Sequence, residues 1–276
     1  MNKKIGIIFA LVVVAFLVMG TASAGLFDFL GGNDAGNSTA NDESTFIVGF
    51  DAEFPPYGFK DDSGNYTGFD LDLAKEVCER NNWTFKAQPI DWDAKDAELD
   101  SGSIDCIWNG FTIDGRENDY LWSDPYFDNK QVFVVKSDAG ISSIDDLSGK
   151  TVETQKDSSA LAALQGDNKT IADKFGTLTE VADYNTAFMD LESGACDAVA
   201  MDIGVAEYDI KNKNQSDAFS ILDKEITTEK YGVGFKKGNT DLKDQVQSTL
   251  DEMFKDGTVL KIAEKYGISQ DALIQK

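Results

Sequence analysis

Few side chains in this chain are suited to chemistry. Its 276 residues include no histidine, so the commonest catalytic base and the commonest metal ligand are both missing. The cysteines Cys78, Cys106 and Cys196 lack CxxC spacing and are expected to be buried thiols, with a Cys78–Cys106 bridge left open. Only two of the 25 basic residues are arginines, Arg80 and Arg116. These counts exclude His-based triads and zinc sites.

The chain is strongly acidic. It carries 49 acidic and 25 basic residues, for a net charge of −24. A charge of this sign repels phosphate backbones and anionic lipid headgroups, so we do not expect a nucleic-acid partner. Such acidity commonly reflects solubility or a salty habitat and names no ligand. The 42% hydrophobic and 27% charged content is typical of a folded soluble protein, and the length favours two lobes.

The N-terminus has the pattern of an export signal. Two lysines precede an apolar run over residues 5–19, and Ala22-Ser23-Ala24 then offers the small residues that a signal peptidase cuts. Because the run is short for a mature membrane span, we predict a signal peptide or an N-terminal anchor over residues 1–24. Residues 31–44 are rich in Gly, Asn, Ser and Asp, which predicts a flexible tether over 25–44. An exported protein, periplasmic or extracellular, is expected.

Strands and helices alternate from Phe46 onward, as in an α/β protein. Hydrophobic periodicity and turn residues predict a first set of strand, helix, strand, helix and strand over 46–50, 70–80, 84–88, 93–101 and 104–109. A second set of strand, helix, helix and strand is predicted over 151–154, 158–164, 186–193 and 198–201. Two similar α/β lobes follow from this order.

The segments between and after these sets indicate how the lobes are joined. Two β-rich segments, 131–136 and 231–235, bracket the second set and are expected to be the crossing strands of a hinge. Amphipathic helices over 241–255 and 258–266, with Leu242, Val246, Leu250, Met253 and Phe254 on the apolar side, then complete the first lobe. We therefore expect lobe 1 over residues 45–131 and 232–276, and lobe 2 over residues 132–231.

One short pattern occurs in both sets. Residues 99–105 (LDSGSID) and 191–197 (LESGACD) share L, acid, S, G, x, x, D, and each ends a helix and starts a strand. Gly110 and Asp202 stand five residues after the two patterns. Both segments thus deliver residues to the carboxyl ends of equivalent strands, where open α/β sheets bind ligands. The alternative is a common helix-to-strand sequence that recurs by accident.

Seven segments within about residues 45–270 form an ordered series: VGFDAEFPPYGF, GNYTGFDLDLAKEV, IDWDAKDAELDSGSIDCIWNGFTIDGRE, DLSGKTVETQKDSSA, DLESGACDAVAMD, YGVGFKKGN and LDEMFKDGTVLKIAEKYG. In this order they resemble the polar-amino-acid family of solute-binding proteins of ABC importers (family 3), which have the type II periplasmic-binding-protein fold. The resemblance implies a monomer that captures a free polar or basic L-amino acid by hinge closure and delivers it to membrane permease subunits. It implies no enzyme activity, no cofactor and no metal.

The resemblance also implies how the ligand's charged groups are held. Arg116 corresponds to the arginine that grips the α-carboxylate with two parallel hydrogen bonds, and Asp202, from the opposite lobe, to the carboxylate for the α-ammonium group. The stretch from Thr112 to Arg116 is one residue shorter than in the family, and Gly115 can supply the compensating backbone freedom. The amides and hydroxyl of Ser158 and Ser159 are expected to complete the carboxylate site, unless they only cap a helix.

Further positions correspond to the family's remaining contacts. Gly110 matches a backbone acceptor for the ammonium group, and Thr112 a hydroxyl donor to the carboxylate. Two aromatic walls for the ligand's side chain match Phe54 and Trp92, for which core packing is the alternative. The positions that contact polar side-chain groups match Asp51, Asn109 and Gln155. Lysine, arginine, glutamine and cystine all remain candidate ligands.

Two other functions fit the same fold. Cyclohexadienyl dehydratases, which act on prephenate or arogenate, resemble this family and would need a general acid such as Glu53 or Asp51 in the cleft. A soluble amino-acid sensor that docks on a receptor is the other alternative. The sequence favours the binding protein, because an amino-acid site accounts for more of the matching residues than a catalytic site does.

Overall fold

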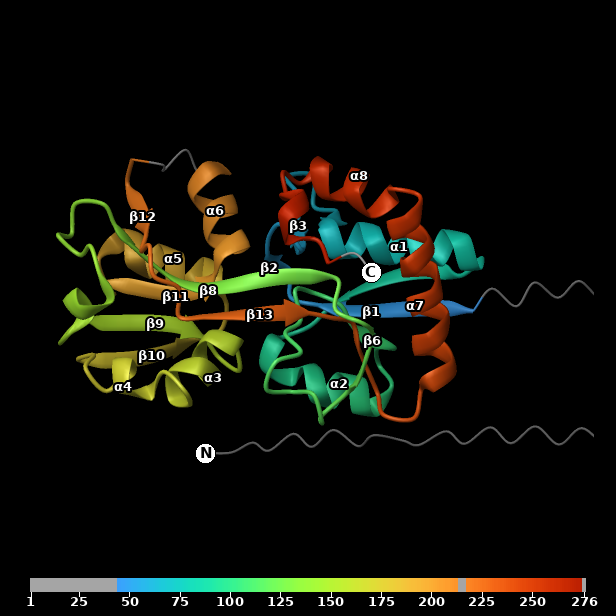
Figure 1. The fold of residues 1–276 in the computed structure, drawn as a ribbon, viewed down its shortest axis with the longest axis horizontal. Coiled ribbons are helices and arrows are strands. Elements are labelled where there is room, and N and C mark those ends of the chain that lie inside the picture. Colours follow the sequence, from blue (N-terminus) through green and yellow to red (C-terminus); the bar gives the residue numbers. More distant parts are fainter. Residues whose placement is uncertain (1–43, 213–216, 275–276) are drawn as a thin grey trace, which may run out of the picture. The chain divides into compact units, whose positions relative to one another are not determined.

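A computed structural model describes residues 44–212 and 217–274 (Figure 1). The expected signal segment and nearly all of the expected tether lie outside these residues. Among the described helices, none is both long enough and apolar enough to cross a membrane. The described chain forms two larger β-sheets, of five and six strands, and a small three-stranded sheet.

The first sheet has the strand order β5-β1-β6-β14-β7. Strand β1 pairs in parallel with β5 and β6, and β14 pairs antiparallel with β6 and β7. Its strands are β1 (Thr45–Phe50), β5 (Thr84–Pro89), β6 (Cys106–Ile107), β7 (Leu121–Trp122) and β14 (Gly234–Phe235). Its helices are α1 (Phe69–Asn81), α2 (Lys95–Ser101), α7 (Thr240–Lys255) and α8 (Thr258–Lys265). On α1 the predicted apolar face is buried: Leu71, Ala74, Val77 and Cys78.

The second sheet has the order β10-β9-β11-β8-β12, with β13 also paired to β8. Its strands are β8 (Phe127–Lys136), β9 (Thr151–Gln155), β10 (Thr177–Val181), β11 (Ala198–Asp202), β12 (Phe219–Ile221) and β13 (Thr227–Tyr231). Its helices are α3 (Ser159–Gln165), α4 (Lys169–Ala172), α5 (Tyr184–Ser193) and α6 (Ile203–Asn212). The small sheet holds β2 (Glu53–Phe54), β3 (Gly58–Lys60) and β4 (Tyr66–Thr67), and short 3₁₀ turns occupy Trp92–Ala94, Ile144–Leu147 and Gln270–Ala272.

Strands β8 and β13 of the second sheet run side by side and extend from that sheet toward the first (Figure 1). They pair antiparallel from Phe127 opposite Tyr231 to Gln131 opposite Thr227. The first crossing strand therefore begins before the predicted 131–136. The prediction of the second crossing strand over 231–235 is wrong, because β13 ends at Tyr231 and β14 begins only at Gly234 in the first sheet. Polar residues fill β13, so hydrophobic periodicity did not reveal it.

The repeated LxSGxxD pattern corresponds to the same local structure in both sheets. Gly102 ends α2 with φ 79° and ψ 17°, and Gly194 ends α5 with φ 82° and ψ 18°. Each final aspartate then pairs with the first residues of the neighbouring parallel strand. Asp105 N–H donates to Ile47 O, and Asp197 N–H to Thr151 O, both at 2.8 Å, while the two carboxylates accept the N–H of Ile47 and Thr151. The two segments are structurally equivalent, and each leads into a strand whose end contributes to the cavity.

The three cysteines are all free and buried, so the Cys78–Cys106 bridge is not formed. Burial raises the pKa of the Cys78 and Cys196 thiols to about 12. Since the thiolate is the reactive form, these side chains behave as small apolar groups.

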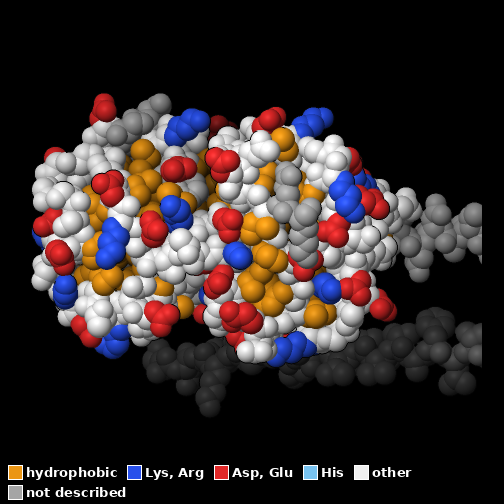
Figure 2. Space-filling view, viewed as in Figure 1, with side chains coloured by type: hydrophobic (Ala, Val, Ile, Leu, Met, Phe, Trp, Pro, Cys, Tyr) orange, Lys and Arg blue, Asp and Glu red, His pale blue; other side chains and the backbone are white. Residues whose placement is uncertain are grey.

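Acidic and basic side chains are interspersed on the face of the described residues drawn in Figure 2. Neither sign gathers into a single patch over one lobe there. On that face the net negative charge is spread over the surface, as expected for a charge that serves solubility.

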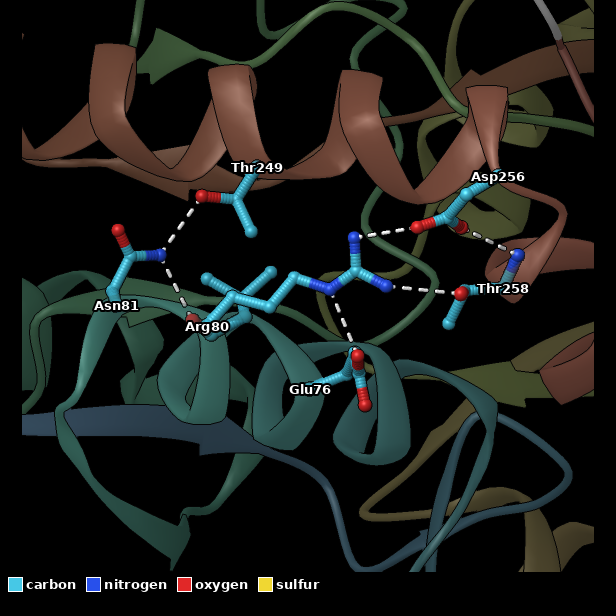
Figure 3. Close-up of polar contacts among 7 residues, drawn as sticks. Glu76, Arg80, Asn81, Thr249, Asp256 and Thr258 are labelled. Atoms are coloured by element: carbon cyan, nitrogen blue, oxygen red, sulfur yellow. Dashed lines mark hydrogen bonds and ion pairs between the residues drawn. The ribbon is translucent and has the colours of Figure 1, made fainter.

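The other arginine, Arg80, joins α1 to the turn between α7 and α8 (Figure 3). Its guanidinium donates to Glu76 and Asp256 at 2.8 Å and to the Thr258 hydroxyl at 3.0 Å. Next to it, the Asn81 amide donates to Thr249 Oγ1 at 2.8 Å. Arg80 is therefore a structural residue of the first lobe.

We expect Arg80→Ala to lower the melting temperature by about 2–4 °C, because partly exposed ion pairs contribute modestly to stability. Thermal unfolding followed by circular dichroism measures the change, and Lys75→Ala, on the exposed side of the same helix, is the matched control. Equal melting temperatures for the two variants contradict the structural role.

Candidate ligand-binding site

All eleven predicted site residues line one cavity between the two large sheets. The space between its lining atoms, with open solvent at the mouth included, is about 290 Å³. The lining residues are Asp51, Phe54, Trp92, Asn109, Gly110, Thr112, Arg116, Gln155, Ser158, Ser159 and Asp202. Most of them follow the last residues of parallel strands in one sheet or the other, which is where open α/β sheets bind ligands. Their location together agrees with the sequence prediction, while the contact of each with a ligand stays a prediction.

Asp202 is the last residue of β11 and is only 4% exposed. Its Oδ1 accepts hydrogen bonds from Asn129 Nδ2 and Gln131 Nε2 at 2.7 Å and from the Tyr231 hydroxyl at 2.5 Å. Burial, and secondly the nearby Glu229 carboxylate, raise the pKa of Asp202 above its usual value. Among the described residues, no Lys or Arg forms an ion pair with Asp202. The site thus holds a buried carboxylate whose cationic partner does not come from the described protein.

Arg116 also lines the cavity and comes from the first sheet, on a turn that follows β6. The turn is closed by a 2.8 Å hydrogen bond from Arg116 N–H to Ile113 O. Gly115 adopts φ 82°, a left-handed conformation that glycine adopts readily, in agreement with the backbone freedom expected at this position. The guanidinium donates to Asp157 O at 2.9 Å and to Thr112 O at 3.4 Å. Because a guanidinium has five N–H groups, donors remain for a ligand carboxylate.

The position of Gly110 is fixed by the buried Asp70, which stands at the start of the predicted helix over 70–80. The Gly110 N–H donates to Asp70 Oδ2 at 2.5 Å, and the other Asp70 oxygen accepts the Tyr126 hydroxyl at 2.8 Å. With φ 54°, and with Phe54 and Tyr231 atoms 2.8 and 3.1 Å from where a Cβ would lie, position 110 admits only glycine without rearrangement. Burial raises the pKa of Asp70 to about 7.

The two serines and Thr112 already have partners in the protein. The Ser158 hydroxyl caps α3 by accepting the Leu161 N–H at 3.1 Å, so the capping role holds. The hydroxyls of Ser159 and Thr112 donate to Glu229 Oε1 at 3.1 and 2.9 Å. Glu229, on β13, was not predicted. The sequence gives no signal for it, because β13 reads TTEKY and is polar throughout.

The opposite end of the cavity contains the groups predicted to contact a ligand's side chain. Asp51 is 6% exposed, and its Oδ2 accepts Gln155 Nε2 at 2.6 Å, a contact between the ends of β1 and β9. The Asp51 N–H donates to Asn109 Oδ1 at 2.9 Å. Burial raises the pKa of Asp51 to about 6. Glu53, which follows closely, is exposed.

Phe54 and Trp92 are both buried and both line the cavity. The Phe54 ring lies 5.6 Å from Tyr57 and 6.0 Å from Tyr184, and Trp92 packs edge-on against Phe111 at 5.4 Å. Each ring therefore belongs to a core cluster and presents a side to the cavity, so core packing and the predicted wall role are compatible.

These features define a class of protein. Two α/β lobes joined by paired strands, with a buried polar cavity at the strand ends of both, make a small-molecule binding protein of the type II periplasmic kind. The chain belongs to the bacterial extracellular solute-binding proteins, family 3, which it matches over residues 46–269. Among the described residues, no cluster of three Cys, Asp or Glu side chains is placed to hold a metal ion.

Individual relatives agree with this family. The chain is 32% identical over 232 residues to the L-cystine-binding protein TcyJ of Escherichia coli (strain K12), covering 82% of this chain and 83% of that protein. An ABC uptake transporter substrate-binding protein from Streptococcus pneumoniae with bound histidine superposes with a TM-score of 0.80 at 32% identity, covering 83% of this chain and 94% of that one.

A third similar structure bears on the enzyme alternative. It is an ancestral amino-acid-binding protein described as a precursor of cyclohexadienyl dehydratase. It superposes with a TM-score of 0.73 at 32% identity, covering 81% of this chain and 95% of that one. The three similar proteins are named as binding proteins rather than as enzymes.

Proposed function

We propose that this protein captures a free L-amino acid with a polar or basic side chain outside the cytoplasm and delivers it to the permease subunits of an ABC importer. The observation that carries the proposal is that Arg116, which follows strand β6 of the first sheet, and Asp202, at the end of strand β11 of the second, line one cavity. A zwitterion has a carboxylate for the guanidinium and an ammonium for the buried carboxylate. The names of the relatives, which bind cystine and histidine, support an amino acid as ligand.

The opposite end of the cavity favours a ligand whose side chain donates hydrogen bonds. Asp51 is buried, and Glu53 and Asp183 add further negative charge around it. An ammonium, a guanidinium or an amide can donate to such a carboxylate, with Gln155 and Asn109 beside it. Lysine, arginine, glutamine and cystine therefore remain the candidates, with the rings of Phe54 and Trp92 enclosing the ligand's side chain.

Capture proceeds by closure of the two lobes about β8 and β13. The ligand first binds Arg116, Gly110 and Thr112, and Asp202 and the serine loop then close over it. Contacts across the cleft support such a closed state: Gln155 donates to Asp51, Arg116 donates to Asp157 O, and the buried Lys95 forms an ion pair with the Asp157 carboxylate. A ligand that touches both lobes favours closure by its differential affinity.

The remaining parts of the proposal concern organisation. We propose export through residues 1–24, a monomeric body, and lobe boundaries near residues 131 and 231. The described strands support these boundaries, because the first sheet takes residues 45–122 and 234–235 and the second takes residues 127–231.

Free amino acids should raise the melting temperature of protein that has been unfolded and refolded to remove bound ligand. At about 100 times its Kd, a ligand selective for the native state adds about 2.7 kcal/mol, or about 5–10 °C for a chain of this size. Differential scanning fluorimetry against all the amino acids measures this, with the matching D-amino acids as controls. If none of the amino acids raises it, the amino-acid assignment fails.

A dehydratase is the second candidate, and the observation that favours it is Asp51. Burial raises the pKa of this cavity-lining carboxyl to about 6, which suits a general acid near neutral pH. Incubation with prephenate and arogenate, followed by chromatography of the products, tests it. Formation of phenylpyruvate or phenylalanine that stops in Asp51→Asn supports the enzyme, whereas unchanged substrate excludes it.

A further inference from the structure

Four buried polar side chains form a row across three neighbouring strands. Asp202 on β11 stands opposite Gln131 on β8, and Asn129, two residues before Gln131, stands opposite Glu229 on β13. All four are 5% exposed or less. A row of this kind, at the point where both crossing strands meet the cavity, is not needed to hold a sheet together.

The two carboxylates of the row share the same two amide nitrogens. Asn129 Nδ2 lies 2.7 Å from Asp202 Oδ1 and 2.8 Å from Glu229 Oε1, and Gln131 Nε2 lies at the same two distances. The amide oxygens of Asn129 and Gln131 have no hydrogen-bond partner among the described residues. Both amides are thus oriented by the carboxylates, although this leaves their own oxygens unsatisfied.

The described protein supplies no positive charge to this row. Among the described residues, no Lys or Arg forms an ion pair with Asp202 or Glu229, and the donors around the two carboxylates are neutral amides and hydroxyls. A buried charge is costly unless it is paired. Two adjacent buried carboxylates beside a ligand cavity therefore need either a bound proton or a cation from the cavity.

Glu229 also fixes the hydroxyls of two cavity-lining residues. Thr112 Oγ1 and Ser159 Oγ lie 2.9 and 3.1 Å from Glu229 Oε1. A hydroxyl has one hydrogen, and here that hydrogen is donated to Glu229. The Thr112 oxygen therefore has only lone pairs left for a group in the cavity, so the predicted donation from Thr112 to the ligand's carboxylate does not fit this arrangement. The Ser159 oxygen also accepts Gln131 Nε2 at 2.8 Å.

We propose that Glu229, which lies behind the lining residues Thr112 and Ser159, is a positioning residue for their hydroxyls and adds a second negative charge to the site for the ligand's α-ammonium group. With their hydrogens held by Glu229, these two hydroxyls join Asp202 in presenting acceptors to the cavity. An ammonium group has three N–H donors and no acceptor, so it matches such a wall, whereas a hydroxyl or a methylene at the same place does not. The proposal rests on the proposed function and assigns Glu229 the discrimination for an α-amino group.

The test compares an amino acid with the same molecule lacking its α-amino group. Suitable pairs are L-lysine with 6-aminohexanoic acid and L-glutamine with glutaramic acid, chosen by which amino acid the wild type binds. We expect Glu229→Gln to weaken binding of the amino acid by about 10- to 100-fold, since a charge-assisted contact is lost. Binding of the analogue, measured by displacement calorimetry, should change by less than about 3-fold.

Two further variants separate this role from a general loss of structure. Glu225→Gln, which removes a partly exposed carboxylate close to β13, is the matched control and should bind as the wild type does. Thr112→Val should weaken binding of the amino acid in the wild type but have little further effect in the Glu229→Gln protein, because the two residues act together. The melting temperature of ligand-free Glu229→Gln should not fall.

The outcomes distinguish the two levels of the proposal. If the wild type binds no amino acid, the proposed function fails and the role of Glu229 fails with it. If the wild type binds one, and Glu229→Gln either binds it equally well or loses the amino acid and its analogue to the same extent, only the role of Glu229 is overturned.

Discussion

Replacing Arg116 by lysine should weaken binding of the amino acid by about 10- to 100-fold, and replacing it by alanine should weaken binding by about 100-fold or more. Lysine keeps the charge but offers a single ammonium in place of two parallel N–H groups. Alanine leaves the ligand carboxylate buried without a partner. Calorimetric titration with the amino acid found by thermal shift measures both effects.

The structure provides a matched control for this prediction. Arg80, the other arginine, contacts Glu76 on α1, Asp256 in the turn before α8 and Thr258 at the start of α8, and it is not among the residues that line the cavity. Arg80→Lys should therefore leave affinity unchanged. Wild-type affinity in Arg116→Lys would show that the guanidinium does not hold the carboxylate in the proposed way.

The sequence predicted the parts of the fold that repeat a simple pattern. The strands over 46–50, 84–88, 151–154 and 198–201 and the helices between them are present with small shifts at their ends. The LxSGxxD pattern located equivalent strand ends because glycine is needed for the left-handed helix cap and aspartate for the bond to the next strand. Residues that follow such strand ends, including Asp202 and Gly110, were therefore accessible from sequence.

Two physical reasons account for several of the strands that the sequence did not predict. Strands β2, β4 and β7 are two residues long, too short to show a period of two. Strand β13 buries Glu229 by hydrogen bonding rather than by apolar contact, so its sequence, TTEKY, does not read as a core strand. Polar networks depend on partners that are distant in sequence, such as Thr112 and Asn129 for Glu229, and one sequence does not reveal these partners.

Replacing Asp202 by asparagine should abolish amino-acid binding and yet stabilise the ligand-free protein at pH 7.5, by about 1–3 kcal/mol. Asparagine keeps an oxygen that can accept from Asn129, Gln131 and Tyr231, but it carries no charge beside Glu229. Removing one of two adjacent buried carboxylates relieves desolvation and repulsion. The same change removes the partner of the ligand's ammonium group, so stability and function change in opposite directions.

The pH dependence of this stabilisation follows from the raised pKa of Asp202, whose surroundings contribute Glu229, Tyr57, Tyr184 and Tyr231 but no Lys or Arg among the described residues. In the folded ligand-free protein this carboxyl keeps its proton to higher pH than in the unfolded chain. The contribution of protonated Asp202 to the stability of the wild type is therefore present at low pH and is lost as pH rises through the folded pKa, whereas asparagine at this position does not titrate.

Urea unfolding of ligand-free wild type and Asp202→Asn at pH 5 and pH 7.5 measures this effect, and the gap in free energy of unfolding should widen at pH 7.5. Asp51 and Asp70, whose pKa values burial also raises, are present in both proteins, so the difference isolates position 202. Asp128→Asn, an exposed change on β8, should leave stability nearly unchanged at both pH values. A variant at position 202 that is less stable than the wild type at pH 7.5 would mean that the described protein already compensates this carboxylate, and the ammonium site would then lose its electrostatic basis.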